Sequence, residues 1–241
     1  EYGHHAGVTP ENSTTVPVVW PWCNSEYPIS NFAAVWPTDE IGVTQTQDPA
    51  LLARAKQTVF ALNDYQMTPW ANINGFCQSW PPAVRLSGRS DSERVLKSIA
   101  GAITAVTGNN GCGTFNQGRG MLENVGATEA INSLLLQSQG SYMRFFPVWN
   151  ATALGPASFT TLRAYGAFLV SGSVDKFGVV ATLSLLSEVG EDAVFESPWS
   201  NNSAPIVKNS NSGSLVPVDE VSAGVYAFKT TAGNSYTIHS A

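Results

Sequence analysis

The chain contains 241 residues, of which 12 are Lys or Arg and 18 are Asp or Glu, so its formal net charge at pH 7 is −6. The few dispersed basic residues exclude a nucleic-acid-binding surface, because neutralising phosphates requires clustered Lys and Arg. No apolar run reaches the roughly 18 residues of a membrane span. Charged residues make up only 12% of the chain, and most of its polar side chains are uncharged Ser, Thr, Asn and Gln. This composition indicates a secreted or cell-surface protein.

The chain starts at Glu1 with neither Met nor a signal-like segment, so we expect a processed or truncated start. Three Asn-x-Ser/Thr sequons, the acceptors for N-glycosylation, support a secretory route. They begin at Asn12, Asn150 and Asn201. Some such matches arise by chance in a chain rich in Asn, Ser and Thr. We nevertheless expect at least one of the three sequons to be glycosylated.

The three cysteines, Cys23, Cys77 and Cys112, show no C-x-x-C spacing. We therefore expect neither a zinc site nor any other metal or cofactor. Their odd number leaves two interpretations open. All three are buried thiols, or one disulfide forms and leaves a thiol that is buried or paired outside this segment.

The first forty residues predict a long loop, because prolines interrupt every periodic run. This loop is rich in aromatic residues: Tyr2, Trp20, Trp22, Tyr27, Phe32 and Trp36. Aromatic faces stack on the apolar faces of sugar rings, and polar side chains can bind sugar hydroxyls. The alternative is that these rings pack the loop onto helices.

Helical patterns begin at Asp48, a capping residue followed by Pro49 at the first helical position. Apolar residues at helical spacing follow to residue 64. A loop carrying Trp70 and Asn72 leads to further helical segments, the first breaking at Gly88 and the next running through residues 90–106.

A Gly-rich loop over residues 108–120 precedes the most regular amphipathic pattern of the chain, which predicts a helix over 125–136 that stops by Gly140. The loop delivers Glu123 and Asn124 to the start of this helix. Loops on a rigid scaffold are frequent sites of function.

After Gly140 the hydrophobic period falls from 3.6 to 2, and short β-branched or aromatic runs alternate with Gly, Asn, Pro or Ser. These runs predict an antiparallel sandwich or barrel, with a polar loop over 201–214. We expect an α+β multidomain chain, with a helical domain at 1–140 and a β-sandwich domain at 141–241.

Four sequence blocks resemble glycoside hydrolases related to the family 95 α-L-fucosidases. They are S-N-F-A-A-V-W-P with D-E-I-G (30–42), V-R-L-S-G (84–88), N-V-G-A through L-L-L-Q-S (124–138) and L-R-A-Y-G-A-F (162–168). Their order and spacing cover nearly the whole chain. The resemblance implies the C-terminal part of a six-hairpin (α/α) toroid followed by a β-sandwich.

The resemblance also implies an inverting hydrolysis of a fucose- or galactose-containing glycan. The third block of the family carries an Asp that activates water, and Leu122 stands at that position here. Glu123 is the next residue and becomes the catalytic candidate, although a carboxylate at a helix N-terminus can also be purely stabilising. The substrate-binding candidates are Asn31, Trp36, Trp70, Asn72, Arg119 and Asn124. Arg119 could alternatively form a salt bridge with Glu123, and we expect Glu129 on the helix to be solvated or paired.

Two functional classes remain open from the sequence. The first is an extracellular glycoside hydrolase whose toroid is completed by an N-terminal segment or a second chain. The second is a non-catalytic carbohydrate-binding or structural glycoprotein derived from the same fold, which the Leu122 replacement favours.

Overall fold

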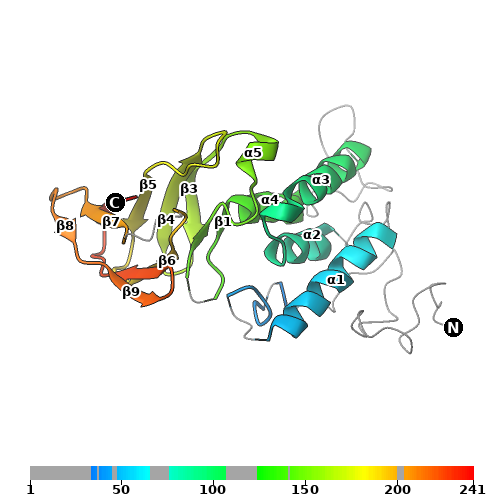
Figure 1. The fold of residues 1–241 in the computed structure, drawn as a ribbon, viewed down its shortest axis with the longest axis horizontal. Coiled ribbons are helices and arrows are strands. Elements are labelled where there is room, and N and C mark those ends of the chain that lie inside the picture. The colour runs from blue at the N-terminus through cyan, green and yellow to red at the C-terminus, as the bar shows by residue number, and fades with distance from the viewer. Residues whose placement is uncertain are drawn as a thin grey trace. The chain divides into compact units, whose positions relative to one another are not determined.

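A computed structural model describes residues 34–36, 38–44, 48–65, 76–106, 124–140, 142–199 and 204–241. The chain divides into two compact units, Glu1–Ser133 and Leu134–Ala241. The described residues combine helices with antiparallel sheets, so the predicted mixture of helix followed by antiparallel sheet is confirmed (Figure 1).

The first unit contains the predicted helices. They are α1 (Pro49–Tyr65), α2 (Phe76–Arg85), the 3-10 turn η4 (Arg89–Asp91), α3 (Ser92–Val106) and most of α4 (Asn124–Leu135). Helix α1 begins as expected, because Asp48 Oδ1 accepts the Ala50 amide at 2.8 Å and Pro49 occupies the first helical position. Helix α2 packs against both α1 and α3.

Helix α2 buries its C-terminal half completely, although it contains Pro81 and Pro82. Trp80 and Val84 are 2% and 0% exposed and form part of the core. Asp91 then fixes the turn into α3, because its Oδ2 accepts the Gly88 amide at 2.9 Å. The break at Gly88 is therefore where the sequence predicts it.

Helix α4 (Asn124–Leu135) matches the predicted helix over 125–136 to within one residue at each end, but it ends before Gly140, the predicted stop. The carbonyls of Leu134 and Leu135 accept the amides of Trp149 and Phe146 at 3.2 and 2.7 Å, so the backbone leaves the helix to pair with a later segment. The following residues form β1 (Leu136–Gln137), which pairs with β2 (Arg144–Phe145). Gly140, with a φ of 89°, lies in the connection between these strands.

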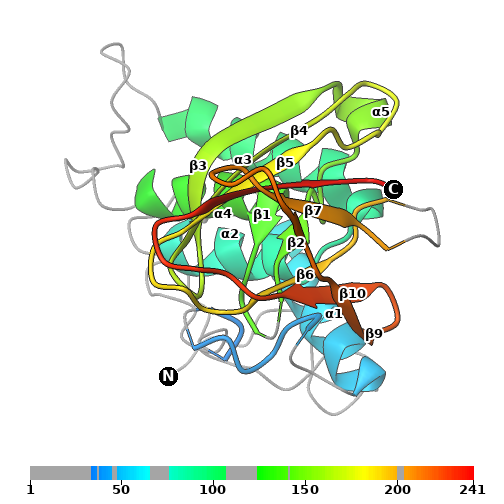
Figure 2. The same ribbon diagram turned by 90° about the vertical axis from the view of Figure 1, so that its left-hand side faces the viewer.

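The second unit contains two larger antiparallel sheets. The six-stranded sheet has the order β3-β4-β5-β11-β7-β8, with β3 (Ala157–Ala164), β4 (Phe168–Val174), β5 (Leu183–Ser187), β11 (Ser235–His239), β7 (Ile206–Asn209) and β8 (Leu215–Val216). The three-stranded sheet has the order β6-β10-β9, with β6 (Ala193–Glu196), β10 (Val225–Phe228) and β9 (Asp219–Ser222). Figure 2 shows β9 and β10 side by side.

Both sheets contribute side chains to one hydrophobic core. Phe195 on β6 lies at its centre, with its ring centroid 6.2 Å from those of Tyr226 and Phe228. The Phe228 ring lies 5.4 Å from Tyr236 on β11 of the larger sheet. Aromatic pairs at these separations add to the stabilisation from apolar burial.

Two elements of this unit differ from the prediction. Strand β7 lies within the residues 201–214 that the sequence predicts as a polar loop. It forms because Val207 pairs with Ile238 of β11, and both side chains are buried. Helix α5 (Ala151–Leu154) is a short turn before β3 that the sequence pattern does not indicate.

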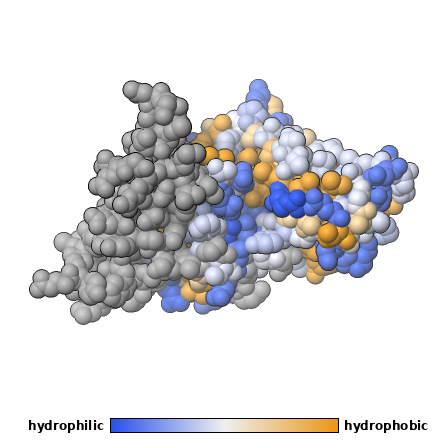
Figure 3. All heavy atoms as spheres, turned by 180° about the vertical axis from the view of Figure 1, so that it is seen from behind, coloured by the Kyte–Doolittle hydropathy of each residue, from blue (hydrophilic) through white to orange (hydrophobic). Residues whose placement is uncertain are grey.

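In the described parts of the chain, no helix is both long and apolar enough to cross a bilayer. Among the coloured residues in Figure 3, hydrophobic side chains lie between hydrophilic ones. Several large hydrophobic side chains of the second unit are exposed, including Tyr165, Phe177, Val179, Val189, Leu215 and Val221.

Candidate functional site

Most of the predicted site residues lie outside the described residues. These are Glu123, Asn31, Trp70, Asn72 and Arg119, the sequon residues Asn12 and Asn201, and the cysteines Cys23 and Cys112. Asn124 and Cys77 belong to the backbones of α4 and α2, and their side chains are not described. The roles predicted for all of these residues remain predictions.

Two predicted residues are described. Trp36 is half-buried in the turn at 34–36, and this loop closes where the Ala34 carbonyl accepts the Glu40 and Ile41 amides, both at 2.8 Å. Asn150, the second sequon residue, is half-buried and precedes α5. Its Oδ1 accepts the Thr152 hydroxyl at 2.7 Å, so the two sequon side chains contact each other.

Arg85, at the end of α2, joins three separate segments of the first unit. Its Nη1 donates to Asp39 Oδ1 and, at 3.4 Å, to the Val35 carbonyl. Its Nη2 donates to Glu129 Oε1 on α4 at 2.8 Å. Of the two states predicted for Glu129, solvated or paired, the structure confirms the paired one.

The Arg85 side chain is only 9% exposed, whereas the side chains of Asp39 and Glu129 are 14% and 31% exposed. Removing this cation would leave two carboxylates together without a counter-charge, whereas removing one carboxylate would leave Arg85 with the other. The planar donor geometry of arginine suits two carboxylates better than a lysine would. Ser133 also donates to Glu129 Oε1 at 3.2 Å, which fixes that carboxylate from its own helix.

The three residues come from three of the four sequence blocks compared above with the family 95 hydrolases. Asp39 belongs to the block at 30–42, Arg85 to the block at 84–88 and Glu129 to the block at 124–138. The sequence analysis identified these blocks but predicted no ion pair between their charged residues. A search for opposite charges among them could have found the cluster.

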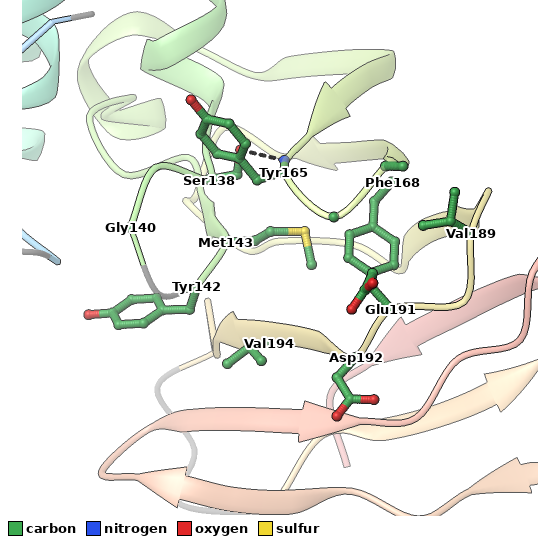
Figure 4. Close-up of a pocket in the computed structure, with 12 residues that line it drawn as sticks. Ser138, Gly140, Tyr142, Met143, Tyr165, Phe168, Val189, Glu191, Asp192 and Val194 are labelled. Carbon is green, nitrogen blue, oxygen red and sulfur yellow. Dashed lines mark hydrogen bonds between the residues drawn. The ribbon is translucent and has the colours of Figure 1, made fainter. Parts of the chain in front are cut away.

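A pocket of about 490 Å³ lies within the second unit, beside the turn between β3 and β4 (Figure 4). Its lining includes Ser138, Tyr142, Met143, Tyr165, Phe168 and Glu191. Figure 4 shows the Met143 side chain directed towards the Phe168 ring, with Tyr142 at one end of the group and Val189 at the other. Met143 and Phe168 are buried, so they form the apolar floor.

The local geometry of the β3–β4 turn shapes this pocket. Gly166 and Ala167 have φ values of 82° and 55°. A Cβ at Gly166 would lie 2.6 Å from the Phe168 ring, so this glycine permits the ring to pack under the turn. The Tyr165 amide donates to Ser138 Oγ at 3.1 Å, which holds the turn against the residues after β1.

Acidic groups dominate the charge around the pocket. Asp192 Oδ2 accepts Lys229 Nζ at 2.5 Å, so that carboxylate is paired, whereas Glu191 is exposed. Burial and, to a lesser extent, the nearby Glu196 carboxylate raise the pKa of Tyr142. The Tyr142 hydroxyl therefore keeps its proton at neutral pH and can act as a hydrogen-bond donor.

Sequence reasoning missed this pocket. The run at 158–174 reads as one continuous β pattern, which hides the turn at Tyr165. The sequence A-Y-G-A at 164–167 could have indicated the turn, because an isolated Gly in a strand pattern indicates a bend.

Within the described residues, no group of three or more His, Cys, Asp or Glu side chains could hold a metal ion. No protein-family model matches the chain, and the comparison with curated proteins gave no match.

Proposed function

We propose that this chain is the C-terminal segment of an extracellular glycoside hydrolase of the α-L-fucosidase-related type, which acts by inversion on a fucose- or galactose-containing glycan. The observation that carries the proposal is the ion pairing of Arg85 with both Asp39 and Glu129. Three blocks that resemble the family on sequence alone thus belong to one ion-paired cluster.

The helices α1 to α4 supply part of the six-hairpin toroid in this proposal, and the two antiparallel sheets form the terminal sandwich. A toroid of six helical hairpins needs more helices than the described part of the chain contains. We therefore propose that an N-terminal segment or a second chain completes it. That part also supplies the general acid.

Glu123 is the proposed general base, and it orients the water that attacks the anomeric carbon. Inverting hydrolysis requires two carboxyl groups roughly 6.5 to 9.5 Å apart, with the water between one of them and the sugar. Glu123 lies one residue before α4, whose position Glu129 and Arg85 fix. The side chains of Asn31, Trp36, Trp70, Asn72, Arg119 and Asn124 bind the substrate in this scheme.

The second candidate is a non-catalytic carbohydrate-binding or structural glycoprotein. Leu122, at the position of the water-activating Asp of the family, favours it. Both candidates share the fold and the ligand class, and they differ only in whether Glu123 performs chemistry. Turnover therefore distinguishes them.

The test uses the native protein together with any chain attached to it, identified by intact mass and peptide mapping. Hydrolysis of a fluorogenic α-L-fucoside and release of fucose from fucosyllactose are measured for the wild type, Glu123→Gln and Glu129→Gln. Because Gln cannot accept a proton from water, we expect Glu123→Gln to lower kcat by about 10²–10⁴-fold and to leave sugar binding nearly unchanged.

Glu129→Gln is the matched control, since it removes a carboxylate six residues further along the chain, keeps an acceptor for Arg85 and leaves the Arg85–Asp39 pair in place. We expect it to retain turnover. Full activity of Glu123→Gln would refute the catalytic role of Glu123. Sugar binding without turnover in the wild type would favour the non-catalytic candidate instead.

A further inference from the structure

The pocket beside the β3–β4 turn lies in the second unit, apart in sequence from Glu123 and every other proposed catalytic or substrate-binding residue. We propose that it is a separate carbohydrate-binding subsite, which takes one neutral sugar residue and stacks its apolar face on Tyr165. Its volume of about 490 Å³ falls within the range of small-molecule sites. The proposal stands whether or not the protein hydrolyses glycosides.

The apolar part of the pocket suits a sugar ring. Tyr165 is 61% exposed at the rim, whereas Phe168 and Met143 are 2% and 3% exposed at the floor. An aromatic side chain exposed beside a pocket can stack on the C–H face of a pyranose, and the thioether of Met143 adapts to irregular shapes.

The polar part of the pocket favours a neutral ligand. Among the described residues that line it, none carries a basic side chain. Glu191 and Asp192 therefore repel anions, and Lys229 partly neutralises Asp192. The exposed Glu191 carboxylate can accept hydrogen bonds from sugar hydroxyls.

The pocket is held in shape by its backbone. Ser138 Oγ accepts the Tyr165 amide at 3.1 Å, and the Ala167 carbonyl accepts the Glu188 amide at 3.0 Å. The turn that presents Tyr165 is thus hydrogen-bonded on both sides. A preformed site loses less conformational entropy when the ligand binds.

Methionine methyl NMR tests the proposal at the site itself. The chain has three methionines, Met67, Met121 and Met143, and only Met143 belongs to the pocket lining. The full chain with labelled methionine methyl groups is titrated with fucosyllactose and with lactose, and Met143→Leu assigns the signal. We expect at least one of these neutral sugars to shift the Met143 signal in a saturable way.

Tyr165→Ala is the decisive variant, and Phe177→Ala is its matched control. Phe177 is 72% exposed and does not line the pocket, so its loss removes a similar exposed ring elsewhere in the same unit. We expect Tyr165→Ala to raise the Kd seen at Met143 about tenfold. The control should bind like the wild type, and high salt should not weaken binding of a neutral sugar.

No Met143 shift at millimolar sugar would overturn the proposal, and so would an equal Kd in Tyr165→Ala. A shift caused only by a lysine-containing peptide and abolished by salt would assign the pocket to cations instead. The Met121 signal reports on the segment two residues before Glu123. A shift at Met121 alone would support sugar binding near Glu123 while rejecting the pocket, so the two proposals can fail separately.

Discussion

Arg85 on α2 and Glu129 on α4 are 44 residues apart in the sequence, and an ion pair of 2.8 Å joins them. The same guanidinium holds Asp39 of the preceding loop. This cluster joins the loop that carries Asp39, the end of α2 and the helix α4. It is both the strongest support for the proposed function and a point at which stability can be tested.

Replacing Arg85 by Met should destabilise the helical unit by about 3 kcal/mol, because Asp39 and Glu129 would then lose their shared cation in a mostly buried place. Urea unfolding followed by circular dichroism at the helical band measures the change. Lys56→Met is the control, since the Lys56 side chain is 37% exposed whereas that of Arg85 is only 9% exposed. It should cost less than about 1 kcal/mol. Equal losses in both variants would contradict the special role of Arg85.

Gly172 on β4 should not tolerate a methyl group. A Cβ there would lie 2.6 Å from Leu183 Cδ2 and 3.4 Å from the Phe159 ring. We expect Gly172→Ala to lower the free energy of unfolding by about 1–3 kcal/mol through overpacking. Thermal unfolding measured by calorimetry checks this.

Gly101 provides the opposite case within the same chain. It lies exposed inside α3, and a methyl group added at this position would have no neighbour within 4 Å. Gly101→Ala should stabilise the protein by about 0.5–1 kcal/mol, because alanine has the higher helix propensity. A stabilising Gly172→Ala, or a destabilising Gly101→Ala, would contradict the packing described here.

The Arg163–Glu188 pair predicts a pH effect in the second unit. A hydrogen bond from Arg163 lowers the pKa of Glu188. A carboxyl whose pKa is lowered on folding stabilises the protein above its unfolded pKa, and this contribution is lost as pH falls through the folded pKa. Arg163→Met should therefore raise the pKa of Glu188 towards its ordinary value, as NMR titration of the side-chain carboxyl will show.

Lys229→Met is the control for this titration. Lys229 pairs with Asp192, and its loss should leave the pKa of Glu188 unchanged. Because Arg163 is 61% exposed, high salt should also reduce the difference between the wild type and Arg163→Met. A Glu188 that titrates identically in the wild type and in Arg163→Met would contradict the ion pair.

The helices could be predicted from the sequence because their signals are local. Asp48 caps α1 two residues from the amide that it binds, and the break at Gly88 lies three residues from Asp91. Strand β7 could not be predicted in this way. Its short apolar core around Val207 becomes a strand only through pairing with β11, far along the chain.

The side-chain clusters were harder to predict for the same reason. Arg85 meets Asp39 and Glu129 across separations of 46 and 44 residues, which no periodic pattern encodes. The pocket depends on the backbone bend at Gly166 and Ala167, which a continuous β pattern conceals. Local rules therefore predicted the elements, whereas tertiary pairing determined the sites.

The stereochemistry of fucose release tests the central claim most directly. Proton NMR can follow the native protein as it acts on an α-L-fucoside and identify the anomer that forms first, before mutarotation. Inversion predicts that β-L-fucose appears first, and that Glu123→Gln abolishes this signal while Glu129→Gln keeps it. Initial release of α-L-fucose, or undiminished β-L-fucose from Glu123→Gln, would contradict the account.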